Sequence, residues 1–166
     1  MNKFTELEYK FADQIESHIV KALPKLYDNF VEFRKATEEE DCRFSYDMVF
    51  GMNFTISIRI RKNSYLKYND LTIRSKSKFG GKTEIDKIMD GLAQVYFYSY
   101  MNKEETELVK IRIADVDAIR NLYKNGKFTG PRKNFDGTEL IAFSFSNIAN
   151  IGGAIYKYDY LPKKYI

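Results

Sequence analysis

Four cationic side chains occupy two short segments in which apolar and polar residues alternate. Arg59 and Arg61 alternate with isoleucines in 54–61, and in 70–76 Leu71 and Ile73 lie opposite a polar side formed by Thr72, Arg74 and Lys76. Strict alternation predicts strands with one apolar and one polar face. If the two strands pair as neighbours, the four cations share one face and repel one another unless an anion compensates them. The pattern therefore predicts a face that binds the phosphates of DNA or RNA. Its residues are Arg59, Arg61, Arg74, Lys76, Lys78 and Lys82.

The distribution of charge along the chain favours the same interpretation. The formal net charge is +4, but residues 42–82 contain nine basic and two acidic residues. Tyr65, Tyr68 and Phe79 are interleaved with these cations, and aromatic faces can stack nucleic-acid bases. The alternative is a structural network in which nearby carboxylates supply the counter-charge. These carboxylates are Asp47, Asp70, Glu84 and Asp86.

Some of these carboxylates could instead hold a metal ion. Oxygen ligands suit Mg²⁺, and bound Mg²⁺ can activate a water molecule against a phosphodiester. The metal ligands would be Asp47, Asp70 and Glu84, and the catalytic residues would be Asp47, Glu84 and Lys87. Any acid in the first turn of a helix is also favoured by the helix dipole, so Glu84 has a structural explanation as well. The expected cofactor is therefore none, or Mg²⁺ if the protein is a nuclease.

Composition narrows the class of protein. A length of 166 residues predicts a single domain over 1–166, with a less regular C-terminal extension over 127–166. One cysteine and one histidine exclude an internal disulfide and a Cys/His zinc site. The chain has no apolar run long enough for a membrane span and no signal-peptide pattern at its start, so we expect a cytoplasmic protein. Thirteen tyrosines also make a protein partner plausible.

The order of periodic segments predicts an α+β fold. A long N-terminal helix over 4–23 precedes strands at 42–50, 54–60 and 70–76, which would form an antiparallel meander. Thr83 could cap a crossover helix over 84–100, and a further strand follows at 108–113. Asp115 begins a short helix that ends near Gly126. A strand at 139–145 and a short helix at 146–151 complete the expected elements.

This order resembles the common core of the PD-(D/E)XK nuclease superfamily, over roughly residues 4–113. The segments S-I-R-I-R at 57–61, D-L-T-I-R-S at 70–75 and G-K-T-E-I-D-K at 81–87 look like those of small proteins encoded by phages and prophages. In the superfamily, an acidic residue on one strand and a D/E-x-K triplet on the next hold Mg²⁺. The resemblance places Asp47 at the first position, and Lys87 or Gln94 at the position where the crossover helix contributes.

The expected D/E-x-K triplet is missing from its strand, which reads Ser57-Ile58-Arg59 or Arg59-Ile60-Arg61. Arginine in place of a carboxylate repels a metal ion but suits phosphate. The resemblance thus implies a phage or prophage accessory protein that binds nucleic acid without cutting it. A nuclease in which Glu84 and Lys87 replace the strand pair is the second hypothesis. A protein that binds and inhibits a host defence nuclease, in the host cytoplasm, is the third.

Overall fold

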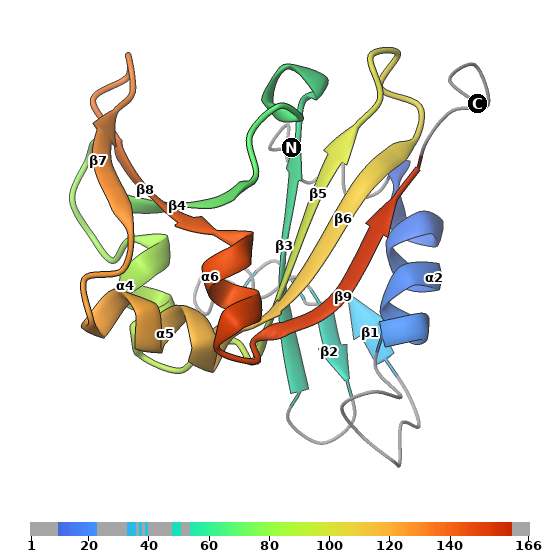
Figure 1. The fold of residues 1–166 in the computed structure, drawn as a ribbon, viewed down its shortest axis with the longest axis horizontal. Coiled ribbons are helices and arrows are strands. Elements are labelled where there is room, and N and C mark those ends of the chain that lie inside the picture. The colour runs from blue at the N-terminus through green and yellow to red at the C-terminus, as the bar shows by residue number, and fades with distance from the viewer. Residues whose placement is uncertain are drawn as a thin grey trace.

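The computed structural model describes residues 10–22, 33–35, 37, 39, 48–50 and 54–160. Within them the fold is α+β, with four α-helices and two β-sheets (Figure 1). The helices are α2 (Ala12–Ala22), α4 (Glu84–Met89), α5 (Val116–Lys124) and α6 (Phe145–Asn150). The six-stranded sheet has the order β1 (Phe33–Lys35), β2 (Met48–Phe50), β3 (Phe54–Arg61), β5 (Val95–Met101), β6 (Leu108–Asp115) and β9 (Ala154–Asp159). The three-stranded sheet has the order β4 (Asp70–Lys76), β8 (Glu139–Ser144) and β7 (Thr129–Lys133).

Helix α2 covers one face of the six-stranded sheet. Apolar residues recur here every three or four positions, and Ile15 and Ile19 of α2 and Phe11 just before it are buried against the sheet. Residues at alternate positions of the sheet strands pack against these helix residues, among them Ile56, Ile60 and Phe97. The apolar stripe of the helix repeats about every 3.6 residues, and the apolar face of the strands repeats every two residues. Packed together, they form the first of two apolar cores.

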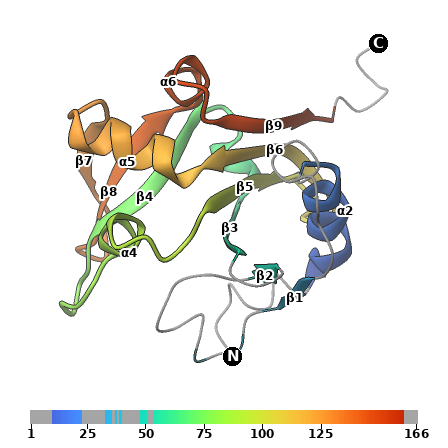
Figure 2. The same cartoon turned by 90° about the horizontal axis from the view of Figure 1, so that it is seen from below.

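The other face of the six-stranded sheet is covered by α4, α5, α6 and the three-stranded sheet. Figure 2 shows these elements together on one side, with α2 on the opposite side. The second core lies between them, and three tyrosines of β5 contribute to it from alternate positions, namely Tyr96, Tyr98 and Tyr100. Strand β5 is therefore buried on both faces, and all seven of its residues are buried.

The predicted meander is wrong in its pairing. Residues 54–61 pair with Met48–Phe50 as an antiparallel hairpin, as expected. Residues 70–76 form a strand with the predicted bounds, but β4 leaves the first sheet and pairs antiparallel with β8. Strand β3 instead pairs in parallel with β5. Alternation identifies a strand, whereas the choice of its neighbour depends on distant residues that alternation does not specify.

The predicted crossover helix over 84–100 is also wrong beyond its first turns. Thr83 caps α4 as expected, and its hydroxyl accepts a hydrogen bond from the Asp86 amide. The helix ends at Met89, and Gly91, with φ of +82°, reverses the chain. The next segment, V-Y-F-Y-S-Y-M, is rich in aromatic residues that favour strands. Because β5 is covered on both faces, it lacks the alternation of a half-buried strand.

The C-terminal half follows the sequence more closely. Asp115 caps α5 through its side chain, and β8 and α6 occur where strand and helix were expected. The structure adds β7 and β9, which the sequence did not indicate. Of the predicted N-terminal helix over 4–23, residues 12–22 are helical, while residues 4–9 and 23 lie outside the described residues. No described helix is long and apolar enough to cross a membrane.

Candidate functional site

The carboxylate of Glu84 joins four elements between the two sheets. Glu84 is the first residue of α4, and the capping box at Thr83 fixes the start of that helix. Its Oε2 accepts hydrogen bonds from the Arg59 guanidinium of β3 and from the backbone amide of Arg74 in β4, the latter at 2.9 Å. Its Oε1 accepts a hydrogen bond from the Tyr96 hydroxyl of β5. Both carboxylate oxygens are therefore occupied by partners within the chain.

This cluster carries one ion pair in a largely enclosed position. The side chains of Arg59 and Glu84 are 11% and 23% exposed. Burial alone would raise the pKa of Glu84, but the Arg59 charge and the hydrogen bonds from Tyr96 and the Arg74 amide hold it below its usual value. Burial opposes the charge of Arg59 in the same way, and Glu84 outweighs it, so the pKa of Arg59 is raised. Burial, followed by the Glu84 charge, raises the pKa of the Tyr96 hydroxyl.

The four cations on the two alternating segments do not share one face. Arg59 points between the sheets and is neutralised by Glu84. Arg61 is partly buried and its guanidinium lies 4.2 Å from the centre of the Tyr65 ring. Arg74 and Lys76 are exposed on β4, in the other sheet. The common face required β3 and β4 to be neighbours, and they are not.

Strand register shows residues that the sequence reasoning missed. Arg59, Tyr98 and Arg112 form one row across β3, β5 and β6, and Arg61, Tyr100 and Lys110 form the next row. The guanidinium of Arg112 donates to Asp159 at 2.7 Å, so it too has an internal counter-charge. The signal for the tyrosines was present in Y-F-Y-S-Y at 96–100, where every second residue is tyrosine.

The carboxylates predicted to hold Mg²⁺ do not converge in the described part of the chain. Asp47 lies outside the described residues. Asp70 is four residues before Arg74 on β4, which places it about 13 Å along the strand from the Glu84 contact. Its carboxylate lies 3.9 Å from Arg132 instead. Both oxygens of Glu84 are occupied, and no group of three or more His, Cys, Asp or Glu side chains forms a metal site among the described residues. The described donors do not fit the metal.

The other predicted helix residues have different surroundings from those expected. Lys87 lies on α4 in a partly buried position. Gln94 is not on a helix, because it precedes β5. Its Oε1 accepts hydrogen bonds from the amide and the hydroxyl of Thr55, at 2.8 and 2.7 Å, and so ties β3 to the start of β5.

Exposed cations gather at one end of the three-stranded sheet, which we call the basic end. In the ladder, Lys76 of β4 and Lys133 of β7 both lie opposite Glu139 of β8, so these strand ends meet. The loop 77–82 and the turn 134–138 leave from the same end. Two phenylalanines at these tips, Phe79 and Phe135, are 90% and 110% exposed. The basic end comprises Arg74, Lys76, Lys78, Phe79, Lys82, Lys133 and Phe135, and it omits Arg132, whose guanidinium lies 3.9 Å from the carboxylate of Asp70 at the other end of β4.

The lysines of the basic end are exposed, so their ion pairs with Glu139 and Asp90 are weak. Lys76 lies 3.4 Å from Glu139, and Lys82 lies 2.6 Å from Asp90. Pairs of this kind contribute about 0.2–1 kcal/mol and are screened by salt. Lys78 lies over the Phe79 ring at 5.1 Å, with both side chains at the surface. These cations can therefore be recruited by an external anion at little cost, unlike Arg59.

Comparisons with known proteins add little to this geometry. No protein-family model and no curated protein match the sequence. Among solved structures, the chain is similar to one described as "Structure of D212, a nuclease from a fusselovirus". The sequence identity is 18%, the match covers 86% of this chain and 84% of that one, and the TM-score is 0.46. These values are too low to transfer the nuclease's activity to this chain.

The first prediction concerns the strength of the buried cluster. Glu84→Gln leaves the Arg59 charge without its counter-ion and should lower the free energy of unfolding by about 3 kcal/mol. Glu104→Gln, on the exposed turn between β5 and β6, should change it by less than about 0.5 kcal/mol. Urea denaturation of the two variants and the parent measures both values. Equal, small effects of the two substitutions would contradict the cluster.

The second prediction concerns pH. Because the pKa of Glu84 is lower in the folded protein than in the unfolded chain, its ionised form stabilises the fold above the unfolded-state pKa. That contribution is lost as the pH falls through the folded-state pKa. The difference in unfolding free energy between the parent and Glu84→Gln should therefore be full at pH 7 and shrink below about pH 4. Denaturation midpoints from pH 7 to pH 3 measure it, and a difference that grows on acidification would refute the assignment.

Proposed function

We propose that the protein binds DNA or RNA through the basic end and does not cut it. The observation that carries the proposal is the meeting of exposed cations and two exposed phenylalanines at one end of the three-stranded sheet. This surface keeps Arg74, Lys76, Lys78 and Lys82 from the sequence prediction. It omits Arg59 and Arg61 and adds Lys133.

Electrostatics supports a polyanion as the ligand. Residues 74–82 contain four basic residues and no acid, and residues 127–138, which include the turn, contain three basic residues and one acid, Asp136. Two such segments meet at one end of a small sheet, so their potentials add. Each phosphate that these side chains neutralise releases counter-ions from the nucleic acid, which favours binding at low salt.

The phenylalanines support a ligand with aromatic bases. Phe79 and Phe135 contribute no packing to either core, because both rings face solvent. An exposed phenyl ring beside cations offers a stacking surface, and base stacking on an aromatic side chain contributes about 1–3 kcal/mol per base. A ligand that carried phosphate alone would contact the cations but would have no group to stack on the phenyl rings.

The buried cluster supports binding without cleavage. A nuclease of the type that the sequence resembles would need carboxylates free to hold a metal ion. Among the described residues, Glu84 has both oxygens engaged and Asp70 faces Arg132. The described groups thus serve the fold, and the surface cations remain for the ligand.

The third prediction tests this function by measuring affinity for duplex and single-stranded oligonucleotides at two salt concentrations. Lys78→Ala with Lys133→Ala should weaken binding about tenfold, and should flatten the slope of log affinity against log salt by roughly 1.4–1.8, the value for two lost phosphate contacts. Phe79→Ala with Phe135→Ala should weaken binding to single strands about tenfold with the slope unchanged, because stacking releases no counter-ions.

The matched control removes the same charge elsewhere. Lys21 on α2 and Lys103 on the β5–β6 turn are exposed and do not belong to the basic end. Their double alanine variant should keep the parent's affinity to within about twofold. If this control loses as much affinity as Lys78→Ala with Lys133→Ala, binding is a matter of net charge and the proposed surface is wrong. Cleavage of the oligonucleotides by the parent protein with Mg²⁺ would overturn the non-catalytic part.

A further inference from the structure

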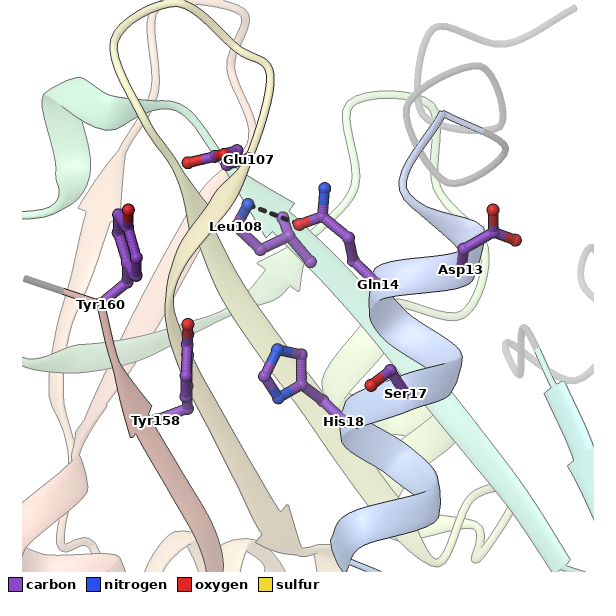
Figure 3. Close-up of a pocket in the computed structure, with 8 residues that line it drawn as sticks. All are labelled: Asp13, Gln14, Ser17, His18, Glu107, Leu108, Tyr158 and Tyr160. Carbon is purple, nitrogen blue, oxygen red and sulfur yellow. Dashed lines mark hydrogen bonds between the residues drawn. The ribbon is translucent and has the colours of Figure 1, made fainter. Parts of the chain in front are cut away.

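A separate hollow lies between α2 and the strands β6 and β9, away from the basic end. Its volume is about 360 Å³, which is within the range of pockets for small ligands. Figure 3 shows the side chains that surround it, which come from α2, from the start of β6 and from the end of β9. The lining residues are Asp13, Gln14, Ser17, His18, Glu107, Leu108, Tyr158 and Tyr160.

Contacts within the chain hold this hollow in shape. The Gln14 side-chain oxygen accepts a hydrogen bond from the Leu108 amide at 2.9 Å, which fixes α2 to the start of β6. The His18 ring lies 4.5 Å from the Tyr158 ring, and its Nδ1 lies 3.0 Å from the Tyr156 hydroxyl. Helix and strand are therefore joined on both sides of the hollow, and no rearrangement is needed to form it.

The charge of the lining is negative in a protein that is basic as a whole. Asp13 and Glu107 are exposed, and neither forms an ion pair with another described residue. The lining contains no lysine or arginine. Burial, followed by the charge of Lys21, lowers the pKa of His18, so the ring is neutral at pH 7. The hollow therefore combines the Glu107 carboxylate with two phenol rings, and Asp13 adds negative charge at its far edge.

This combination selects a flat organic cation. A guanidinium group is planar, stacks on aromatic faces, and pairs with a carboxylate through two parallel hydrogen bonds. An anion would be repelled by Asp13 and Glu107, and a neutral apolar group would leave the Glu107 carboxylate unpaired. In Figure 3 Glu107, His18, Tyr158 and Tyr160 lie on the same side of α2, whereas Asp13 lies at the far edge of the hollow with its carboxylate directed away from them, so Glu107 is the carboxylate that a guanidinium stacked on the rings can reach.

We propose that this hollow binds an alkylguanidinium group, supplied either by an arginine side chain of a peptide or by a small guanidine. The site is independent of nucleic-acid binding at the basic end. In Figure 1 the β7–β8 pair and α2 lie at opposite sides of the molecule, so both ligands could bind at once.

The sequence provides a specific reporter, because His18 is the chain's single histidine. Its imidazole proton resonances can be followed by NMR during titration with butylguanidinium and with acetyl-Gly-Arg-Gly-amide. We expect a saturable shift with both probes, with a dissociation constant of about 1 mM. Tighter binding of the peptide assigns the natural ligand to a protein side chain, and tighter binding of butylguanidinium assigns it to a small guanidine.

Controls separate this site from nonspecific attraction. Acetyl-Gly-Gln-Gly-amide, which lacks the charge, and inorganic phosphate should give no saturable shift. Glu107→Gln and Tyr160→Ala should each weaken the arginine peptide about threefold or more, whereas Glu104→Gln, on the same turn but outside the lining, should not. A backbone NMR spectrum of each variant that matches the spectrum of the parent verifies that the variant keeps the fold. No saturable shift with either guanidinium probe, or equal affinities of Glu107→Gln and Glu104→Gln, would overturn the proposal.

Discussion

The structure depends on the neutralisation of one buried arginine. Arg59 lies on a strand whose polar face is turned toward the second layer, and a guanidinium in that position is costly unless a carboxylate accompanies it. Glu84 supplies that carboxylate from the first turn of α4, and the Tyr96 hydroxyl and the Arg74 amide complete its hydrogen bonds. One side chain thereby links α4 and β4 to the six-stranded sheet, beside the apolar core that packs the second layer on it.

This arrangement divides the chain's cations by function. Arg59 and Arg112 face carboxylates within the chain and serve the packing of the layers. A second group of cations lies at the surface, on β4 and the loop that follows it, next to the cations of β7. This group comprises Arg74, Lys76, Lys78 and Lys82. The excess charge of residues 42–82 is therefore not one surface but two environments. The hollow beside α2 adds a third, in which carboxylates and tyrosines prevail.

The sequence predicted local structure better than it predicted neighbours. Alternation located residues 70–76 as a strand, and side-chain caps located α4 at Thr83 and α5 at Asp115, because these signals involve residues close together in the chain. Pairing of β4 with β8 joins residues about seventy positions apart, and nothing in either segment specifies the other. The same limit explains the site. The sequence analysis expected a network of carboxylates that included Glu84 to supply the counter-charge for Arg59. Only the fold shows that Glu84 is the carboxylate that pairs with Arg59. The fold also places Tyr96, which was expected on a helix, on the strand from which it donates to Glu84.

The most direct test of the account is the coupling between Arg59 and Glu84 in a double-mutant cycle. The free energy of unfolding is measured for the parent, for Arg59→Met, for Glu84→Gln and for the double variant. Each single substitution leaves the other side chain charged and without its counter-ion in the interior, whereas the double substitution removes both charges. The account predicts that the double variant is more stable than the sum of the single effects allows, by about 2 kcal/mol. Additive effects, with no coupling, would show that the two side chains do not pair and would contradict it.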